Sequence, residues 1–382
     1  MTRDVFITRT ASFLPLEPVG NDHMEAALGQ VGERPSRTRR ITLRSNGITA
    51  RHYVTDPATG AVRYTNAQLA AEAVRALADE RFRVTDIACL SCGTSIPDQI
   101  LPGHGVMVHG ELGSAPCEVI TTAGVCAAGA TALKYAWLAV RSGESPNAVA
   151  TASEAVSLNL RATRYTAETD HQAEELATRP ELAFEKDFLR WMLSDAAGAV
   201  LLQPAPAAGG PSLRVDWIDI ASYAHELPAC MYAGAEKNDD GSLTGWARFP
   251  HEELGRRSVL AIKQDVKLLN AKIIEYCLDR PLGAIKARRG LTADAIDWFL
   301  PHMSSEYFRQ PIADGLARIG LPILPERWFT NLATRGNTGS ASFFLMLDEL
   351  LRSGRLRRGQ RLLALVPESG RFTSAYLHFT VV

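Results

Sequence analysis

The feature that most constrains the fold of this chain is an internal repeat. Cys126 opens a run of small residues that becomes apolar at helical spacing and ends in Arg-Ser-Gly at 141–143. Asn337, 211 positions later, opens a similar run that ends in Arg-Ser-Gly at 352–354. An apolar strand-like segment follows each run. A repeat of this length within 382 residues predicts two similar halves.

Apolar strand-like segments alternate with helical patterns in both halves, which is typical of α/β proteins whose sheet is covered on both faces. We place the halves at residues 1–205 and 206–382, because the Pro- and Gly-rich stretch at 204–212 forms a natural joint. Two segments interrupt the alternation. The charged stretch at 167–188 is expected to be a helical excursion, and 225–257 is expected to be a loop-rich insertion.

Composition narrows the class of function. The net charge of −1 argues against a nucleic-acid binder, and no apolar run approaches the length of a membrane span. The amino-terminal residues carry no signal-peptide pattern, and the cysteines are best explained as free thiols, so we expect a cytoplasmic protein. Cys89 and Cys92 form a CxxC pair, but no second ligand pair follows at zinc spacing.

Three side chains are predicted to form a reactive site. Cys126 precedes an expected helix, whose amino terminus would stabilise a thiolate and lower its pKa, although a small buried helix explains the same pattern. His302 follows the strand-like segment at 295–300, and Asn337 occupies the position that corresponds to Cys126 in the repeat. Equivalent loops of related halves meet near the pseudo-symmetry axis, so the three are expected to converge. Cysteine beside histidine and an amide is a recurring nucleophile arrangement.

Several motifs resemble those of the thiolase superfamily, and within it the β-ketoacyl-[acyl-carrier-protein] synthase III group. They follow one another in the expected order over nearly the whole chain. They are RSNGITAR at 44–51, GVCAAG at 124–129, LSDAAGAVLL at 193–202, PH at 301–302 and GNTGSAS at 336–342. The resemblance implies a thiolase-like α/β fold of two pseudo-symmetric halves with α/β/α/β/α layers, and it implies no metal or organic cofactor.

The resemblance also implies a role for each matching residue. Cys126 would be the acyl-accepting nucleophile, and His302 and Asn337 would hold the carbonyl of the second thioester and promote carbanion formation. Gly370 matches the glycine whose backbone N–H joins that of Cys126 in an oxyanion hole. Preorganised donors of this kind stabilise the charge that develops during thioester attack.

Departures from the family pattern bear on substrate recognition. Ser305 stands where the family has an asparagine, Tyr307 stands where it has a carrier-docking arginine, and Arg40 stands where it has an aromatic that stacks on coenzyme A. A carrier-protein thioester therefore explains the chain better than a coenzyme A thioester, which stays the alternative. Arg40 and Arg44, in an arginine-rich stretch, are expected to meet an acidic carrier protein; a merely solvated surface is the other interpretation. We count Arg40, Arg44 and Ser305 among the substrate-binding residues.

The resemblance is strongest to ketosynthases that make 2,5-dialkylresorcinols, at 6–29, 36–53 and 90–105. Such enzymes add the carbanion of a β-ketoacyl thioester to an α,β-unsaturated acyl thioester and close a cyclohexanedione ring. The resemblance further implies a homodimer in which the loop at 94–102 reaches into the partner's pocket, with Leu101 as the floor of the acyl tunnel.

Three other functions stay open. The same cysteine could transfer an acyl group to a hydroxyl or an amine, and Asn337 argues only weakly against this. A non-catalytic ketosynthase partner would not be expected to keep Cys126, His302 and Asn337 together. A cysteine protease does not fit the duplicated strand pattern.

Overall fold

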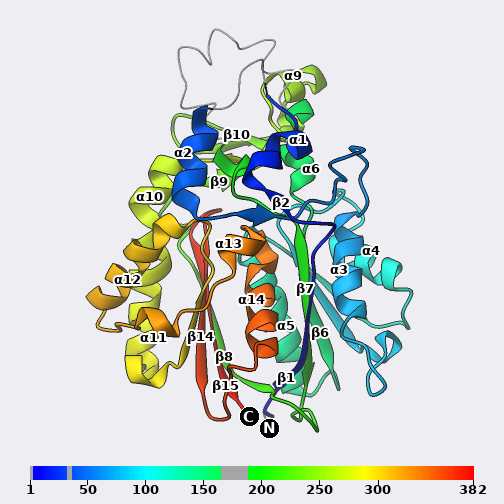
Figure 1. The fold of residues 1–382 in the computed structure, drawn as a ribbon, viewed down its shortest axis with the longest axis vertical. Helices are drawn as coiled ribbons and strands as arrows, with labels where there is room; N and C mark the ends of the chain where they lie inside the picture. Colours follow the sequence, from blue (N-terminus) through cyan, green and yellow to red (C-terminus); the bar gives the residue numbers. More distant parts are fainter. Residues whose placement is uncertain (1–2, 32–36, 165–187) are drawn as a thin grey trace.

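The computed structural model describes residues 3–31, 37–164 and 188–382 (Figure 1). The helical excursion expected at 167–188 lies almost wholly outside the described residues. A nine-stranded mixed sheet forms the centre of the molecule, so the predicted α/β fold class is confirmed. In spatial order its strands are β13 (Trp298–Pro301), β14 (Arg361–Glu368), β15 (Thr373–Val381), β8 (Leu213–Ser222), β1 (Phe6–Phe13), β7 (Ala196–Gln203), β6 (Ala148–Glu154), β4 (Cys89–Thr94) and β5 (Glu118–Ala123).

The two parts of the sheet share one topology. Strand β4 runs parallel to β6, which pairs antiparallel with β7, and β7 pairs antiparallel with β1. In the same way, β13 runs parallel to β14, which pairs antiparallel with β15, and β15 pairs antiparallel with β8. A short antiparallel contact, in which Phe6 and Ile7 of β1 face Arg214 and Leu213 of β8, joins the two parts.

Two apolar helices lie between the two parts of the sheet, as Figure 1 shows. They are α5 (Ala128–Ser142) and α14 (Ser342–Arg352), the helices that the repeat predicts after Cys126 and Asn337. Gly143 and Gly354 have the left-handed backbone expected of residues that end such helices. The buried faces of α5 and α14 share one hydrophobic core with strands from both parts.

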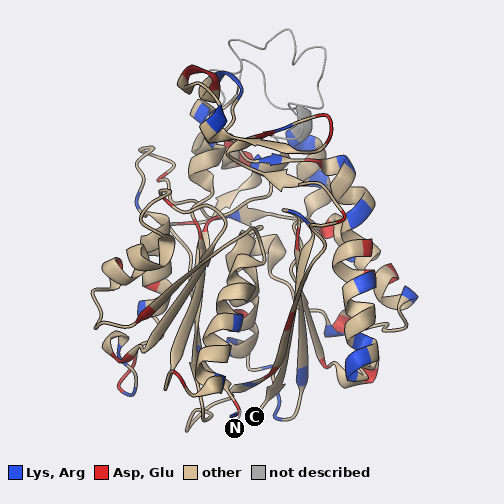
Figure 2. Cartoon of the chain, turned by 180° about the vertical axis from the view of Figure 1, so that it is seen from behind, with Lys and Arg blue, Asp and Glu red and all other residues tan. Residues whose placement is uncertain are grey.

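Further helices cover the outer faces of the sheet. Helices α3 (Asn66–Arg75) and α4 (His104–Leu112) pack beside β4 and β6, and α10 (Val266–Ile274), α11 (Arg280–Arg289) and α12 (Arg309–Arg318) cover the other part. A five-residue π-helical segment, η5 (Glu275–Asp279), joins α10 to α11. Figure 2 shows that Lys, Arg, Asp and Glu gather on these outer helices and above the sheet, while the strands are mostly uncharged.

Shorter elements lie above the carboxyl ends of the central strands in Figure 1. The insertion predicted at 225–257 has only short elements of this kind, as expected of a loop-rich segment. The short elements are β2 (Val19–Gly20), α1 (Met24–Leu28), α2 (Arg37–Asn46), β3 (Ala50–Arg51), α6 (Ser157–Leu160), β9 (Met231–Tyr232), β10 (Ala235–Lys237), β11 (Leu243–Gly245), α9 (His251–Arg256), β12 (Lys263–Gln264) and α13 (Leu332–Arg335). In the described part of the chain, no helix combines the length and apolarity needed to cross a bilayer.

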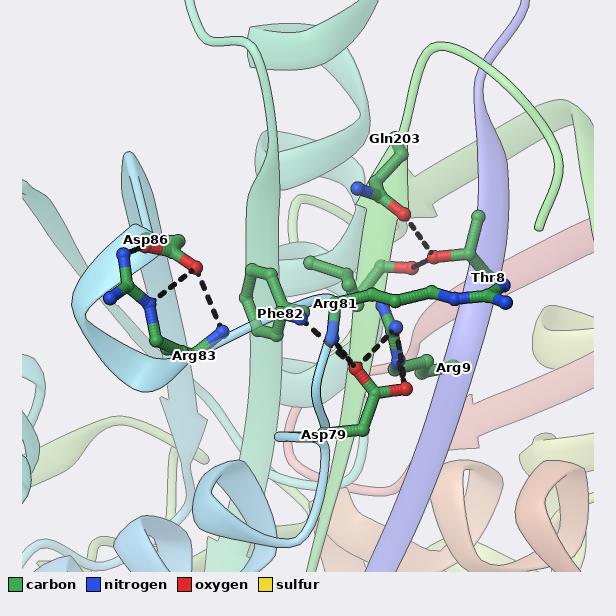
Figure 3. Close-up of polar contacts among 9 residues, drawn as sticks. Thr8, Arg9, Asp79, Arg81, Phe82, Arg83, Asp86 and Gln203 are labelled. Carbon is green, nitrogen blue, oxygen red and sulfur yellow. Dashed lines mark hydrogen bonds and ion pairs between the residues drawn. The ribbon is translucent and has the colours of Figure 1, made fainter. Parts of the chain in front are cut away.

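A polar network holds the loop after α3 against the sheet, as Figure 3 shows. The Asp79 carboxylate accepts hydrogen bonds from the Arg9 guanidinium of β1 and from the backbone N–H groups of Arg81 and Phe82. The Arg9 guanidinium also lies 5.6 Å from the centre of the Phe82 ring. Such exposed pairs contribute little stability each, so their main effect is to fix the path of the loop that leads into β4.

Close packing between α5 and the turn after Asn337 gives a direct test of this arrangement. A Cβ atom added at Gly129 would lie 2.4 Å from the backbone oxygen of Ser340 and 2.8 Å from the Cβ of Ala152. We expect Gly129→Ala to lower the free energy of unfolding by about 1–3 kcal/mol, measured by urea denaturation. Gly110→Ala in α4 is the control, because a Cβ there meets nothing within 4 Å. Equal stability of the two variants would contradict the prediction.

Candidate active site

A cavity of about 350 Å³ opens where the carboxyl ends of β4, β6 and β13 meet the turns that precede α5 and α14. Cys126, His302 and Asn337 all line it. The structure therefore brings together the three residues that sequence analysis predicted to converge. Much of the remaining lining is apolar, and the second half of the chain contributes, among others, Leu269, Ile273, Ile274, Leu278, Phe308 and Ile312.

Cys126 lies in the turn between β5 and α5, two residues before the helix begins, and only 8% of its surface is exposed. The expectation of a lowered thiol pKa is wrong for this environment. Burial raises the pKa of Cys126, and the carboxylates of Glu368 and Glu154 raise it further. Loss of hydration and two nearby negative charges outweigh the helix amino terminus, so Cys126 is a thiol at neutral pH.

His302 directly follows β13, where its backbone N–H donates to the oxygen of Leu365 over 2.8 Å. Its side chain is buried against the cavity, and this burial lowers the pKa of His302 to about 4. The imidazole is therefore neutral at pH 7 and offers one N–H donor and one acceptor nitrogen.

Asn337 is held by its own turn. Its backbone N–H donates to the backbone oxygen of Met192 over 3.0 Å, and its backbone oxygen accepts from the backbone N–H of Ser194 over 2.9 Å. The side-chain Oδ1 accepts from the backbone N–H of Gly339 over 3.0 Å. This contact fixes the orientation of the amide, and within the described residues the Nδ2 group has no hydrogen-bond partner. Asn337 can therefore offer an N–H donor in the cavity.

Glu154 is a lining residue that sequence analysis missed. It ends β6, and its Oε1 accepts from the backbone N–H and the hydroxyl of Ser95, over 3.0 and 2.6 Å. The same oxygen accepts from the backbone N–H and the hydroxyl of Ser340, over 3.2 and 2.6 Å. Glu154 thus ties the loop after β4 to the turn that carries Asn337. The sequence signal that could have indicated Glu154 is a glutamate at the end of a strand whose other residues are all small or apolar.

Gly370 lies beside the nucleophile turn, where a Cβ added to it would lie 2.9 Å from Val125 Cγ2. Its backbone oxygen accepts from Cys230 and Met231, over 2.8 and 3.2 Å. The sequence match therefore corresponds to real proximity between the Gly370 and Cys126 turns. Glu368, two residues earlier, was also missed by sequence analysis.

The other predicted substrate contacts lie outside the cavity lining. The Ser305 hydroxyl accepts from the backbone N–H of Tyr307 and donates to the Ser45 oxygen, so it caps a short helix, and its role as a substrate contact stays a prediction. Arg40 and Arg44 are exposed, one turn apart, on α2. Leu101 is 81% exposed in the single chain. In the described ranges, no group of three or more His, Cys, Asp or Glu side chains is placed to hold a metal ion.

Comparison with known protein families and sequences gives consistent matches. Residues 287–375 match the family described as 3-oxoacyl-[acyl-carrier-protein] synthase III C terminal. A β-ketoacyl-[acyl-carrier-protein] synthase III of Xanthomonas campestris pv. campestris is 28% identical over 379 residues, which cover 98% of each chain. The corresponding protein of Xanthomonas oryzae pv. oryzae is 28% identical over 361 residues, 94% of this chain and 92% of the relative.

Solved structures share the fold over nearly the full length. AbyA1, a tetronic acid condensing enzyme, superposes with a TM-score of 0.75 at 20% identity and covers 98% of this chain and 99% of its own. Cerulenin-bound OleA of Xanthomonas campestris gives 0.71 at 19% identity, over 99% and 97%. FabH of Pseudomonas aeruginosa gives 0.69 at 18% identity, over 99% and 98%.

The carboxyl-terminal family match, the chain-length alignments and the shared fold agree with one another. The chain is therefore similar over nearly its full length to β-ketoacyl-[acyl-carrier-protein] synthases III, its carboxyl-terminal part matches the family model of these synthases, and it has their fold.

Proposed function

We propose that this enzyme joins two acyl thioesters through an acyl group carried on Cys126. In the first step the Cys126 sulfur attacks the thioester carbonyl of an α,β-unsaturated acyl group. A thioester to Cys126 forms, the carrier thiol leaves, and the proton of Cys126 ends on that thiol. The backbone N–H groups of Cys126 and Gly370 are the proposed donors to the oxyanion.

The second step forms the carbon–carbon bonds. The N–H donors of His302 and Asn337 hold the carbonyl of a β-ketoacyl thioester. The carbanion at its α-carbon adds to the β-carbon of the acyl group on Cys126, and the proton lost from the first carbon is balanced by a proton gained at the α-carbon of that acyl group. The carbon on the other side of the ketone then loses a proton and attacks the Cys126 thioester carbonyl. The bond between that carbonyl and the Cys126 sulfur breaks, and a proton ends on the released Cys126 thiol. The product is a cyclohexanedione, which is a precursor of a dialkylresorcinol.

The observation that carries this proposal is the shared cavity. It combines a buried thiol, two uncharged donors and an apolar extension over α10, η5 and α12. Two uncharged donors suit an enolate that forms next to a second, covalently held acyl group. AbyA1 is itself a condensing enzyme, so the fold supports condensations of this kind.

Intact-protein mass spectrometry tests the proposal, with 2-alkenoyl and 3-oxoacyl thioesters of a carrier protein offered singly and together. The 2-alkenoyl substrate alone should add one acyl mass to the enzyme, and the pair should yield a cyclohexanedione. An ester or amide formed from an added alcohol or amine, without a ring product, would favour simple acyl transfer instead.

A carrier protein is the proposed partner, and it should dock on α2. Reversing the charge of Arg40 and Arg44 to glutamate should raise KM for carrier-bound substrate, because exposed charges steer an acidic partner. The effect should shrink as salt is added. Arg358→Glu is the control, because Arg358 is also exposed but lies in a separate arginine-rich stretch, at 352–361. Equal KM values at low salt for all variants would place the docking face elsewhere.

We further propose a homodimer that pairs through β5. This strand forms an edge of the sheet, and several apolar side chains near it are exposed in the single chain: Ile100, Leu101, Val106 and Leu138. An uncovered edge strand with apolar neighbours favours association with another chain. In such a dimer Leu101 would contact the partner and close its acyl tunnel.

Leu101→Trp should then shorten the acyl chains that load, without unfolding the protein, because a larger floor leaves a shorter tunnel. Burial of each methylene contributes about 0.8 kcal/mol to binding. Each methylene of the acyl chain that no longer fits in the tunnel should therefore lower the efficiency of loading about fourfold. Loading against chain length is the measurement, and Ile100→Trp is the control for a neighbouring exposed position. An unchanged chain-length profile in Leu101→Trp would reject the floor assignment.

A further inference from the structure

A buried carboxylate lies against the turn that carries Cys126. Glu368 Oε2 accepts from the backbone N–H of Val125 over 3.3 Å, and the backbone of Ala127 also hydrogen-bonds to this carboxylate. A Cβ added to Gly124 would lie 3.3 Å from the same Oε2. Only 9% of the Glu368 surface is exposed. The carboxylate therefore accepts from the residues on both sides of Cys126.

The same side chain reaches the second turn of the site. Glu368 precedes Gly370 by two residues, and a Cβ added to Gly370 would lie 3.0 Å from Glu368 Oε1. Gly370 in turn contacts Val125. One carboxylate thus holds together the two turns whose backbone N–H groups are the proposed oxyanion donors.

The position of this carboxylate also changes the electrostatics of the nucleophile. The free N–H groups before a helix carry partial positive charge, which would otherwise favour a thiolate at Cys126. The negative charge of the Glu368 carboxylate already offsets the partial positive charge of these N–H groups. The titratable groups that line the cavity with Cys126 are Glu154 of β6, Tyr232 of β9, Cys277 of η5 and His302 after β13.

We propose that Glu368 is a positioning residue that joins the Gly370 turn to the Cys126 turn and keeps Cys126 in its thiol form in the free enzyme. This inference rests on the proposed function in one respect. A thiolate adds readily to the β-carbon of an α,β-unsaturated thioester, which would leave an inactive adduct with no leaving group. A protonated Cys126 disfavours this addition, while attack on the carbonyl releases the carrier thiol and proceeds.

The pH dependence of Cys126 alkylation by iodoacetamide tests the electrostatic part without any acyl substrate. Glu368→Gln keeps an acceptor oxygen and removes the charge, so the inflection should move down by about one pH unit or more. One unit means tenfold more thiolate, and the lower nucleophilicity of a less basic thiolate reduces the gain. The rate at pH 7.5 should therefore rise about threefold or more.

Peptide mapping after alkylation reports Cys126 separately, with the half-buried Cys117 as an internal reference. Glu326→Gln, at an exposed position, is the matched control and should leave the profile unchanged. If Glu368→Gln does not fold, Glu368→Asp is the second variant. Its side chain is one methylene shorter, so its carboxylate lies farther from Cys126, and the inflection of the alkylation profile should shift in the same direction. A profile identical to that of the wild type in the folded variant overturns the proposal.

The positioning part is tested by loading from a saturated acyl thioester of N-acetylcysteamine. Glu368→Ala should load at least about tenfold more slowly than Glu368→Gln, because only the glutamine still accepts from the nucleophile turn. Equal loading by the two variants overturns the positioning role.

An α,β-unsaturated thioester of N-acetylcysteamine completes the test. Wild-type enzyme should gain the mass of the acyl group alone, and Glu368→Gln should in addition gain the mass of the entire thioester, as expected of conjugate addition. If Glu368→Gln gains no mass that corresponds to the entire thioester, the protective role of Glu368 is contradicted. If the wild type gains no acyl mass from this compound, the proposed function fails, while the iodoacetamide result still decides the role of Glu368.

Discussion

A Cys126→Ala variant is expected to take up no acyl group from any thioester, whereas the wild-type chain gains the mass of one acyl group. Cys126 is the thiol that lies in the turn before α5 and faces both proposed donors across one cavity. Alanine keeps the small volume that this turn requires and removes the sulfur. The loss of loading should therefore be complete while the unfolding midpoint stays close to that of the wild type.

Cys277 provides the matched control for this experiment. It lines the same cavity, but its sulfur donates to the backbone oxygens of Glu368 and Thr373, over 3.9 and 3.6 Å, and burial raises the pKa of its thiol. Cys277→Ala should therefore load at the wild-type level. An acyl mass shift that persists in Cys126→Ala would show that another residue is the nucleophile.

His302→Ala and Asn337→Ala are expected to separate condensation from loading. Both variants should still acylate Cys126, because the proposed donors for that step are backbone groups. Product formation should fall by about 10²-fold or more, as when one oxyanion donor is removed. Single-turnover measurements of acylation and of product release give the two rates separately.

Asn337→Asp sharpens this test, since it keeps the shape of the side chain and replaces the Nδ2 donor with an acceptor oxygen. It should lose condensation as fully as the alanine variant. The pH dependence gives a second check. Because the pKa of His302 lies near 4, the imidazole is neutral at pH 6 and above, and no inflection from His302 is expected between pH 6 and 8. Normal condensation by Asn337→Asp would exclude the proposed donor role.

Much of the fold could be predicted because the repeat consists of sequence patterns that each extend over only a few neighbouring residues. The runs after Cys126 and Asn337 have helical spacing, end at Gly143 and Gly354, and are followed by apolar strands, and each of these features depends only on neighbouring residues. The convergence of Cys126, His302 and Asn337 on one cavity then follows from placing equivalent loops of two similar halves against each other.

The carboxylates could not be predicted in this way, because their partners are distant in the sequence. Glu154 contacts Ser95 and Ser340, and Glu368 contacts Val125, which is 243 positions away. No periodic pattern encodes such contacts. The thiol pKa was expected in the wrong direction for the same reason, since the helix start is visible in the sequence and the surrounding charges and burial are not.

The ends of the described chain bear on how the enzyme can be handled in the laboratory. Strand β1 starts, and β15 finishes, at the end of the sheet that lies opposite the cavity, and Figure 1 shows the two termini side by side there. A strand of eight residues, such as β1, spans about 26 Å. An affinity tag, a surface tether or a fused carrier domain attached at either end would therefore leave the cavity mouth uncovered. A fused carrier would also need a linker long enough to pass the full height of the sheet before its thioester could meet Cys126.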